Sequence, residues 1–433
     1  MKVLILCYDF PPLISIGGQR PYSWLNYLPD SGVAVTVVTR HWQETMNTPE
    51  DYVKPTAVEI SVETDLLKNT VIRVPFKPNL RDRLLLSFGF NQLVWLRKTL
   101  SLLYTFLEYL MFCFDSKSEI YAAAEKQILA NKPDFIIATG EPFILFRYAH
   151  LLSKKYKIKW VADYRDGWTT NQGHYQLSLL QKIRNLFFRT LEKKYLQGVS
   201  FITTAAPSYA QEFQKLFATT DVRVVYNGFD EKHFQNTAAM ERSAKKFIIT
   251  YAGTIYPHQN LEMFLDGVLL FVDKEKVQKN IFEVHFYGLL GQADAVSRLI
   301  NYKPELLPWL VPLPKISYSQ IVKKMCESHL LLLLSSKGAD WLNAKVFDYL
   351  AAKQKILLVE NDEGVLQKLL QETNGGFAAN NAEEVADFLK QEFEKFKHAR
   401  ITFAETNDNY KKYSRRTQAK IFADLLKTNL LSS

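Results

Sequence analysis

Short runs of aliphatic and β-branched residues alternate with longer amphipathic stretches along the first half of the chain. The runs are continuously apolar, which is typical of parallel strands covered by helices on both faces. We predict strands at 2–6, 33–39, 134–139, 159–163, 200–205 and 222–226. Helical patterns lie between them, at 19–28, 118–130, 142–154, 175–197 and 207–217. This alternation predicts a doubly wound α/β domain.

A second series of the same kind follows the turn signal Asn227-Gly228 and the polar stretch 231–246. Its predicted strands are 246–253, 282–288, 330–336 and 355–360, and a helical stretch begins at 404. We therefore expect two α/β domains with a boundary near residue 229. Two Rossmann-like domains in tandem are expected to face a central cleft at the carboxyl ends of their sheets, where such folds usually bind ligands.

Composition and charge fit a globular protein of this size. The 433 residues are 47% hydrophobic and 23% charged, and the chain is too long for one ordinary core. The 54 lysines and arginines exceed the 45 acidic residues, which leaves a net charge of +9 and favours anionic partners such as acidic lipids or phosphorylated ligands. The basic residues are scattered and carry no nucleic-acid-binding signature, so nucleic acid ranks well below these partners.

Cysteine usage and the first residues favour the cytoplasm. The three cysteines lie far apart and show no pairing pattern, which fits a reducing compartment and argues against disulfides or a structural zinc site. The first apolar run is followed by Asp9 and two prolines, with no small-residue cleavage site. It therefore predicts a buried strand rather than a signal peptide.

The most apolar region of the chain is 84–114. Arg97, Lys98 and Glu108 interrupt it, so it does not read as a membrane-spanning helix. One interpretation is a helical hairpin buried against the domain. The alternative is a surface segment whose aromatic and basic residues contact an anionic membrane from one side.

Three glycine-containing junctions follow predicted strands. Gly17 and Gly18 precede a helix after the first strand, and in the second domain Gly253 and Gly288 end two further strands. Glycines at such places let the backbone approach a diphosphate, and a helix N-terminus favours its negative charge. One junction alone is weak evidence, but three at sheet edges favour an anionic ligand.

The stretch "ADWLNAKVFDYLAA", 339–352, directly follows another predicted strand and combines a lysine with two aspartates. Lys345 near a helix start would favour phosphate oxygens. Asp348, one turn further on, could accept two hydrogen bonds from a ribose diol. Asp340 lies on the loop before the helix and could touch another group of the same ligand.

Taken in order, "GGQR", "YNGFD", "YAGTIYPHQNLEMFLDGV", "FYG" and "AKVFDYLAAKQKILLV" resemble the family 4 retaining glycosyltransferases of the GT-B fold. "PDFIIATGEPF" followed by "KWVADYRDGW" is similar to a bacterial branch that builds surface polysaccharides. The resemblance covers nearly the whole chain. It implies a nucleotide-sugar donor bound by 230–403, an acceptor bound by 1–229, and the stretch 404–433 packed back on the first domain.

The chain departs from the family pattern at several positions. The family carries two glutamates separated by seven residues, and here this pattern falls on Asp340 and Asp348, each one methylene shorter. Many members place Arg and Lys after the glycine that corresponds to Gly253, where this chain has Thr254 and Gln259. A sub-branch with Gln there uses a lysine like Lys345 to meet the phosphate charge.

In the first domain, "TGEPF" stands where several members carry a histidine, and Glu141 is our candidate for a polar group near the reacting centre. Arg165, in "ADYRDGW", could meet the donor phosphates or the acceptor, or could instead pair with a neighbouring aspartate to shape its loop. The histidines and aspartates form no metal-binding motif, so we expect neither a metal nor a cofactor.

Together with these features, the resemblance implies a cytoplasmic glycosyltransferase, peripheral to the inner face of the membrane if 84–114 contacts lipid. It would transfer a hexosyl or N-acetylhexosaminyl group with retention, from a donor such as a UDP-sugar to a glycan or lipid-linked acceptor. Catalytic candidates are Glu141, Asp340 and Lys345. Donor-binding candidates are Gly17, Gly18, Arg165, Gly253, Thr254, Gln259, Gly288, Lys345 and Asp348. The alternatives are a nucleotide-sugar epimerase or hydrolase, and a non-catalytic sugar-nucleotide-binding protein.

Overall fold

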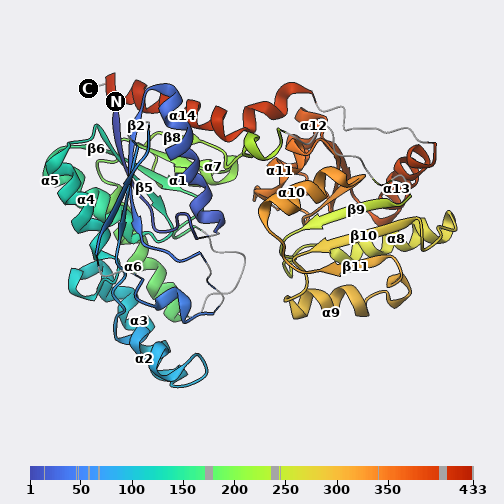
Figure 1. Ribbon diagram of the computed structural model, residues 1–433, viewed down its shortest axis with the longest axis horizontal. Helices are drawn as coiled ribbons and strands as arrows, with labels where there is room; N and C mark the ends of the chain where they lie inside the picture. The colour runs from blue at the N-terminus through green and yellow to red at the C-terminus, as the bar shows by residue number, and fades with distance from the viewer. Residues whose placement is uncertain are drawn as a thin grey trace. The chain divides into compact units, whose positions relative to one another are not determined.

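The computed structural model describes residues 1–13, 15–44, 46, 48–56, 59–66, 69–170, 179–235, 243, 245–339, 341–398 and 407–431, with side chains from 181 onward in the range 179–235. The chain divides into two compact units. Unit 1 comprises Met1–Asn227 and Gln418–Ser433, and unit 2 comprises Gly228–Thr417. Each unit is built around its own sheet (Figure 1).

Unit 1 contains an eight-stranded sheet in the order β3-β4-β2-β1-β5-β6-β7-β8. Its strands are β1 (Lys2–Leu6), β2 (Ala34–Arg40), β3 (Ser61–Thr64), β4 (Thr70–Val74), β5 (Phe135–Gly140), β6 (Lys159–Tyr164), β7 (Phe201–Thr204) and β8 (Val222–Val224). The strands pair in parallel except for β3, which runs antiparallel to β4 at the sheet edge. The carboxyl ends of β1, β5 and β6 therefore meet at one edge of the sheet.

Helices cover both faces of this sheet, because successive side chains of its strands alternate between two apolar clusters. Leu4 and Leu6 of β1 pack in one cluster, while Val3 and Ile5 pack in the other. The first cluster receives side chains from α4 (Ser118–Ala130), α5 (Ile144–Tyr156), α6 (Leu179–Leu196) and α7 (Pro207–Leu216). The second receives side chains from α1 (Ile16–Tyr27) and α14 (Arg415–Leu431).

The last helix thus completes the core of the unit that begins the chain. The ring of Phe422 on α14 lies 4.7 Å from that of Trp24 on α1, centroid to centroid, and 6.3 Å from that of Phe201 on β7. Ala419, Ala423 and Leu426 are buried beside it.

Unit 2 contains a six-stranded parallel sheet in the order β11-β10-β9-β12-β13-β14. Its strands are β9 (Phe247–Ala252), β10 (Phe282–Tyr287), β11 (Leu310–Leu313), β12 (Leu330–Leu334), β13 (Lys355–Val359) and β14 (Gly376–Ala379). The order reverses direction beside β9, which is the neighbour of both β10 and β12. Open α/β sheets bind ligands outside the carboxyl ends of the strands at such a switch point.

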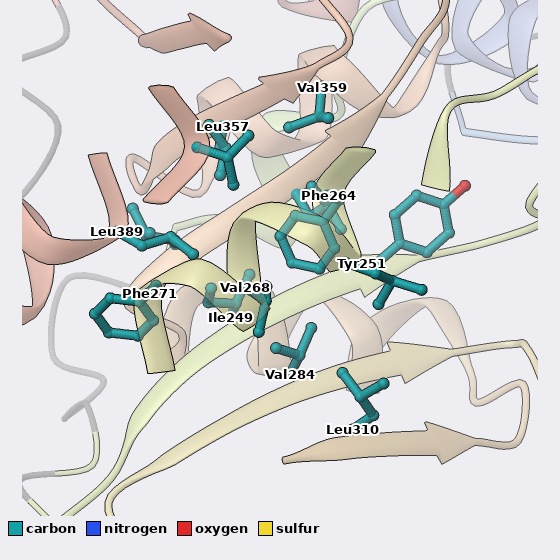
Figure 2. Packing of buried hydrophobic residues seen from close by; sticks show 14 of the residues in the cluster. Ile249, Tyr251, Phe264, Val268, Phe271, Val284, Leu310, Leu357, Val359 and Leu389 are labelled. Atoms are coloured by element: carbon teal, nitrogen blue, oxygen red, sulfur yellow. The ribbon is translucent and has the colours of Figure 1, made fainter. Parts of the chain in front are cut away.

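The core of unit 2 lies between its sheet and helices α8 (Leu261–Lys274), α9 (Ala293–Asn301) and α13 (Ala382–Lys397). Figure 2 shows Phe264, Val268 and Phe271 of α8 packed against Ile249 of β9 and Leu357 of β13. The alternate strand residues Leu331, Leu333 and Leu358 are also fully buried, outside this cluster. Helix α10 (Tyr318–Glu327) contacts β9, and helices α11 (Lys345–Ala351) and α12 (Val365–Thr373) contact β13.

These two doubly wound sheets confirm the predicted fold class. The sequence did not reveal β3, β4, β11 and β14, which are short, partly exposed or interrupted by Pro312. Two further helices, α2 (Leu80–Phe88) and α3 (Val94–Leu110), lie between β4 and α4. Among the described residues, no helix combines the length and apolarity that crossing a membrane requires.

Candidate functional site

In unit 2, two glycines form the carboxyl-end edge of neighbouring strands. Gly253 follows β9 with φ of 113° and Gly288 follows β10 with φ of 87°, a backbone conformation that other residues rarely adopt. A Cβ on Gly288 would lie 3.6 Å from the carbonyl oxygen of Gly253, so the two are adjacent. The bare backbone leaves room for a ligand to approach both peptide groups closely.

Lys345, the first residue of α11, reaches this glycine edge. Its Nζ donates a hydrogen bond to the phenolic oxygen of Tyr251 at 2.9 Å and lies 4.2 Å from the centre of the Tyr251 ring. A Cβ on Gly253 would lie only 3.2 Å from the same Nζ. Within the described part of the chain, no carboxylate forms a salt bridge with Lys345. Removal of the ammonium from water lowers the pKa of Lys345 to about 7.

Tyr251 also organises the loop after β9. Its hydroxyl donates to the carbonyl oxygen of Thr254 at 2.6 Å, and the ring end carrying this oxygen points away from the apolar cluster (Figure 2). Buried Gln259 accepts from the backbone N–H of Tyr256 at 2.9 Å and donates to the carbonyl oxygen of Leu334 at 2.9 Å. Gln259 therefore fixes the loop from inside, while the side chain of Thr254 is exposed at its start.

Asp348 lies one turn beyond Lys345 and is held from α10. Its Oδ1 accepts a hydrogen bond from the hydroxyl of Tyr318 at 2.7 Å. Burial raises the pKa of Asp348 to about 6, against the attraction of Arg415 and the Tyr318 bond, while Asp230 adds repulsion. Asp340, the other predicted carboxylate, lies outside the described residues.

In unit 1, the predicted residues of three segments come together at the carboxyl ends of β1, β5 and β6. Arg165 donates from Nε to the carbonyl oxygen of Gly140 at 2.7 Å and from Nη2 to that of Glu141 at 3.0 Å. A Cβ on Gly17 would lie 1.9 Å from Nη1 of Arg165, so the guanidinium rests against the bare backbone of α1. A Cβ on Gly18 would instead lie 3.2 Å from the backbone of Phe10.

Acidic groups surround this guanidinium. Loss of hydration, followed by repulsion from Asp166 and Asp9, raises the pKa of Glu141 above its ordinary value, and attraction to Arg165 opposes the rise. Asp9 accepts a hydrogen bond from Ser15 at 2.7 Å, and Ser15 caps the first turn of α1 by accepting from Gly17 N–H. Arg165 therefore contacts the backbone of Gly140 and Glu141 and does not pair with Asp163, its near neighbour in sequence.

Asp163 instead pairs with Arg20 beneath the site. Both side chains are buried, with Nη2 of Arg20 at 2.7 Å and Nε at 3.0 Å from the carboxylate. Thr139 and Thr203 donate to the same carboxylate at 2.9 and 2.6 Å. This network, with a further bond from Nη1 of Arg20 to the carbonyl oxygen of Val225, commits Arg20 to the core of unit 1.

Two contacts at the glycine edge of unit 2 were not predicted from the sequence. In the sequence, Tyr251 has the pattern of an ordinary strand residue. Its hydroxyl lies near the glycine edge because Tyr251 is the second-last residue of β9. Tyr349 accepts a hydrogen bond from the backbone N–H of Ala252 at 3.0 Å and ties α11 to the end of β9.

Unit 2 also has a hollow of about 540 Å³ on the opposite edge of its sheet. It is lined by Lys355 and Gly376, which begin β13 and β14, and by the stacked rings of Phe377 and Phe388. Because it lies at the amino ends of the strands, it is separate from the glycine edge. No group of three or more metal-ligating side chains gathers anywhere in the described ranges.

No protein-family model and no curated protein sequence matches this chain. Several solved structures are similar to it along their whole length. Sucrose-phosphate synthase from Thermosynechococcus elongatus is 12% identical, with 100% of both chains covered and a TM-score of 0.64. The trehalose-6-phosphate protein of E. coli bound with UDP-2-fluoro glucose is 13% identical, with 99% of both chains covered and a TM-score of 0.62.

HepE from Anabaena, in complex with UDP and glucose, is 14% identical, with 99% of this chain and 100% of that chain covered and a TM-score of 0.55. At these identities the likeness concerns the fold. The two sheets of this chain, with their flanking helices, have the GT-B architecture that these glycosyltransferases share.

Proposed function

We propose that the protein is a metal-independent glycosyltransferase that moves a sugar with retention from a UDP-sugar to a glycan or lipid-linked acceptor in surface polysaccharide assembly. The observation that carries the proposal is Lys345. A partly buried cation lies beside two bare glycine backbones, with no carboxylate paired to it in the described part of the chain. A diphosphate supplies the negative charge that pairs with Lys345. It occupies the space that the absent side chain of Gly253 leaves open. The UDP-containing complexes of HepE and the E. coli protein support this donor class.

Unit 2 is the donor-binding unit in this proposal. Lys345 meets the diphosphate, and Gly253 and Gly288 permit its close approach. Thr254 contacts the ligand from the exposed start of the loop after β9. Gln259 does not touch the ligand but holds that loop in its conformation. Asp348 accepts from the donor ribose through Oδ2, because Tyr318 occupies Oδ1. Asp340 is assigned to the donor sugar by the sequence pattern alone.

Unit 1 is the acceptor-binding unit. Glu141 orients the attacking hydroxyl, and its raised pKa suits a group that hydrogen-bonds in either protonation state. Arg165, fixed against Gly17 and the carbonyl oxygen of Gly140, meets the donor phosphates or an anionic group of the acceptor. As the bond to the leaving diphosphate breaks, charge builds on its oxygens. Lys345 stabilises that charge, an electrostatic contribution that is usually the largest single one in such sites.

Nucleotide-induced stabilisation tests the donor site directly. We expect UDP and UDP-sugars at a hundredfold their Kd to stabilise the protein by about 2.7 kcal/mol, seen as a raised melting temperature. Lys345→Met should abolish this rise. Lys337→Met is the matched control, because Lys337 is an exposed lysine of the same connection between β12 and α11. Stabilisation that survives in Lys345→Met would contradict the donor site.

Turnover separates the proposed function from its alternatives. We expect release of UDP to require a glycan or lipid-linked acceptor. A nucleotide-sugar epimerase or hydrolase would consume the donor alone, and a sugar-nucleotide-binding protein would show the stabilisation without any turnover.

A further inference from the structure

The surface formed by α2, α3 and the first half of α6 carries many exposed apolar side chains. Within 84–114 only Leu85 and Tyr109 are fully buried, so this segment packs against the domain only in part. Figure 1 shows α2 and α3 at one end of unit 1. Trp95 is 70% exposed and Leu103 is 51% exposed. The other exposed apolar residues of α2, α3 and the turn between them are Leu80, Phe88, Phe90, Val94, Leu102 and Leu110.

Helix α6 continues this surface, although the sequence pattern did not associate it with 84–114. The ring of Phe106 on α3 lies 4.9 Å from that of Phe187, and the ring of Tyr109 lies 5.4 Å from that of Phe188. On α6, Ile183, one turn before Phe187, is 54% exposed, and Leu186, directly before Phe187, is 69% exposed. Helical periodicity places Ile183 on the same side of α6 as Phe187, just as it places Leu102 and Leu103 beside Phe106 on α3.

The charges of this surface are almost all positive. Its basic residues are Arg81, Arg83, Arg97, Lys98, Lys182, Arg184 and Arg189. The sequence of α2, α3 and 181–190 contains only two acidic residues. Asp82 is buried and bonded to Arg81, and Glu108 is bonded to Lys117. Pairing of two copies of the protein through this face would bring like charges together, whereas an anionic surface would be complementary to it.

We propose that α2, α3 and the first half of α6 form one docking face for an anionic lipid bilayer. Trp95 and the exposed leucines enter the interface between headgroups and acyl chains, where aromatic and aliphatic side chains are stable. The surrounding lysines and arginines lie at the level of the lipid phosphates, and each contributes to attraction that salt weakens. This binding is a property of unit 1 and needs neither a donor nor an acceptor.

Sedimentation of the full chain with vesicles tests the proposal. We expect binding to vesicles of phosphatidylglycerol and phosphatidylcholine, and little binding to phosphatidylcholine alone. Lys182→Gln with Arg184→Gln should weaken binding about 30-fold, since each basic residue contributes about fivefold. Ile183→Ser with Leu186→Ser should weaken it at least about tenfold. Leu129→Ser with Lys132→Gln, an exposed pair at the end of α4, should bind like the unchanged protein.

Melting temperatures and donor-induced stabilisation, measured without vesicles, show that each variant is folded. The proposal is overturned if the unchanged protein does not bind anionic vesicles, or binds neutral ones equally well. If both α6 variants bind vesicles as well as the unchanged protein does, α6 is not part of the docking face. A dimer in sedimentation velocity that the α6 variants dissociate, without any vesicle binding, would assign the face to self-association. None of these outcomes bears on donor turnover, so failure here leaves the proposed transfer reaction intact.

Discussion

The Nζ of Lys345 donates a 2.9 Å hydrogen bond to the hydroxyl of Tyr251, an uncharged partner that holds the ammonium in place without neutralising it. The hydroxyl in turn donates a hydrogen bond to the carbonyl oxygen of Thr254 at 2.6 Å. The cation and the loop after β9 are therefore fixed by the same oxygen atom. An anion that enters this edge finds the positive charge already oriented.

Tyr251→Phe should weaken donor binding while leaving the fold intact. The change removes one acceptor from Lys345 and one donor from Thr254 and keeps the buried ring. Hydrogen bonds to charged groups contribute about 1.5–3 kcal/mol, so we expect the Kd for a UDP-sugar to rise at least about tenfold. Calorimetric titration measures this change. Tyr256→Phe, at an exposed tyrosine of the same loop, should leave the Kd unchanged.

The lowered pKa of Lys345 predicts that donor affinity falls as pH rises. A diphosphate favours the ammonium form, but above pH 7 most of the free protein carries a neutral Lys345 and must take up a proton on binding. With UDP-glucose, whose diphosphate does not titrate in this range, we expect the Kd to rise roughly twentyfold between pH 6.5 and 8.5. Lys345→Arg should bind with little pH dependence, because arginine stays charged. A flat profile for the unchanged protein would show that Lys345 does not meet the diphosphate.

Asp348→Asn should stabilise the protein at neutral pH. The pKa of Asp348 in the folded state, about 6, lies above its ordinary value of 3.8, so the folded form binds the proton more tightly than the unfolded form. The contribution of Asp348 to stability is thus complete below about pH 3.8 and is lost as pH rises through about 6. The amide avoids this loss and still accepts the Tyr318 hydrogen bond.

We expect the Asn variant to gain about 1–2 kcal/mol more at pH 7.5 than at pH 4.5, less than full burial would give because Asp348 is only partly buried. Urea unfolding at the two pH values measures it. The exposed Asp408→Asn should show no such trend. Donor affinity should fall in the Asp348 variant alone, because the amide is a weaker acceptor for the ribose hydroxyls.

A methyl group on Gly17 should act through Arg165. Its Cβ would lie 1.9 Å from Nη1, and the guanidinium cannot retreat while Nε remains bonded to the carbonyl oxygen of Gly140. Gly17→Ala and Arg165→Ala should each lower turnover. The double variant should lose less turnover than the sum of the two single losses, because the contact with the guanidinium disappears and only a 2.7 Å contact with Oδ2 of Asp9 remains. Additive losses in this cycle would show that Gly17 has a role of its own.

The sequence predicted the carboxyl-end edges well, because continuous apolar runs mark buried parallel strands and the ends of parallel strands share an edge. Lys345 and Gly253 could therefore be associated before the structure was known. The hydrogen-bond partners of the side chains could not be predicted in this way. That Arg20 pairs with Asp163 and Tyr318 with Asp348 depends on helix rotation and rotamers, which residue spacing does not determine. Nor did the apolar pattern distinguish α3, of which only Tyr109 is fully buried, from a buried helix, because only contacts with other elements decide burial.

The contact of Phe422 with Trp24 has a consequence for the order in which the protein is made. A ribosome completes every strand of unit 1 before it begins unit 2, yet residues 418–431 leave the ribosome only after all of unit 2. Until then Phe201 on one face of the first sheet, and Trp24 on the helix α1 that packs there, have no α14 to cover them. The nascent chain must therefore keep an apolar surface exposed while unit 2 is being synthesised. The described core residues of unit 2 all come from one continuous stretch, so unit 2 can fold before α14 packs onto unit 1.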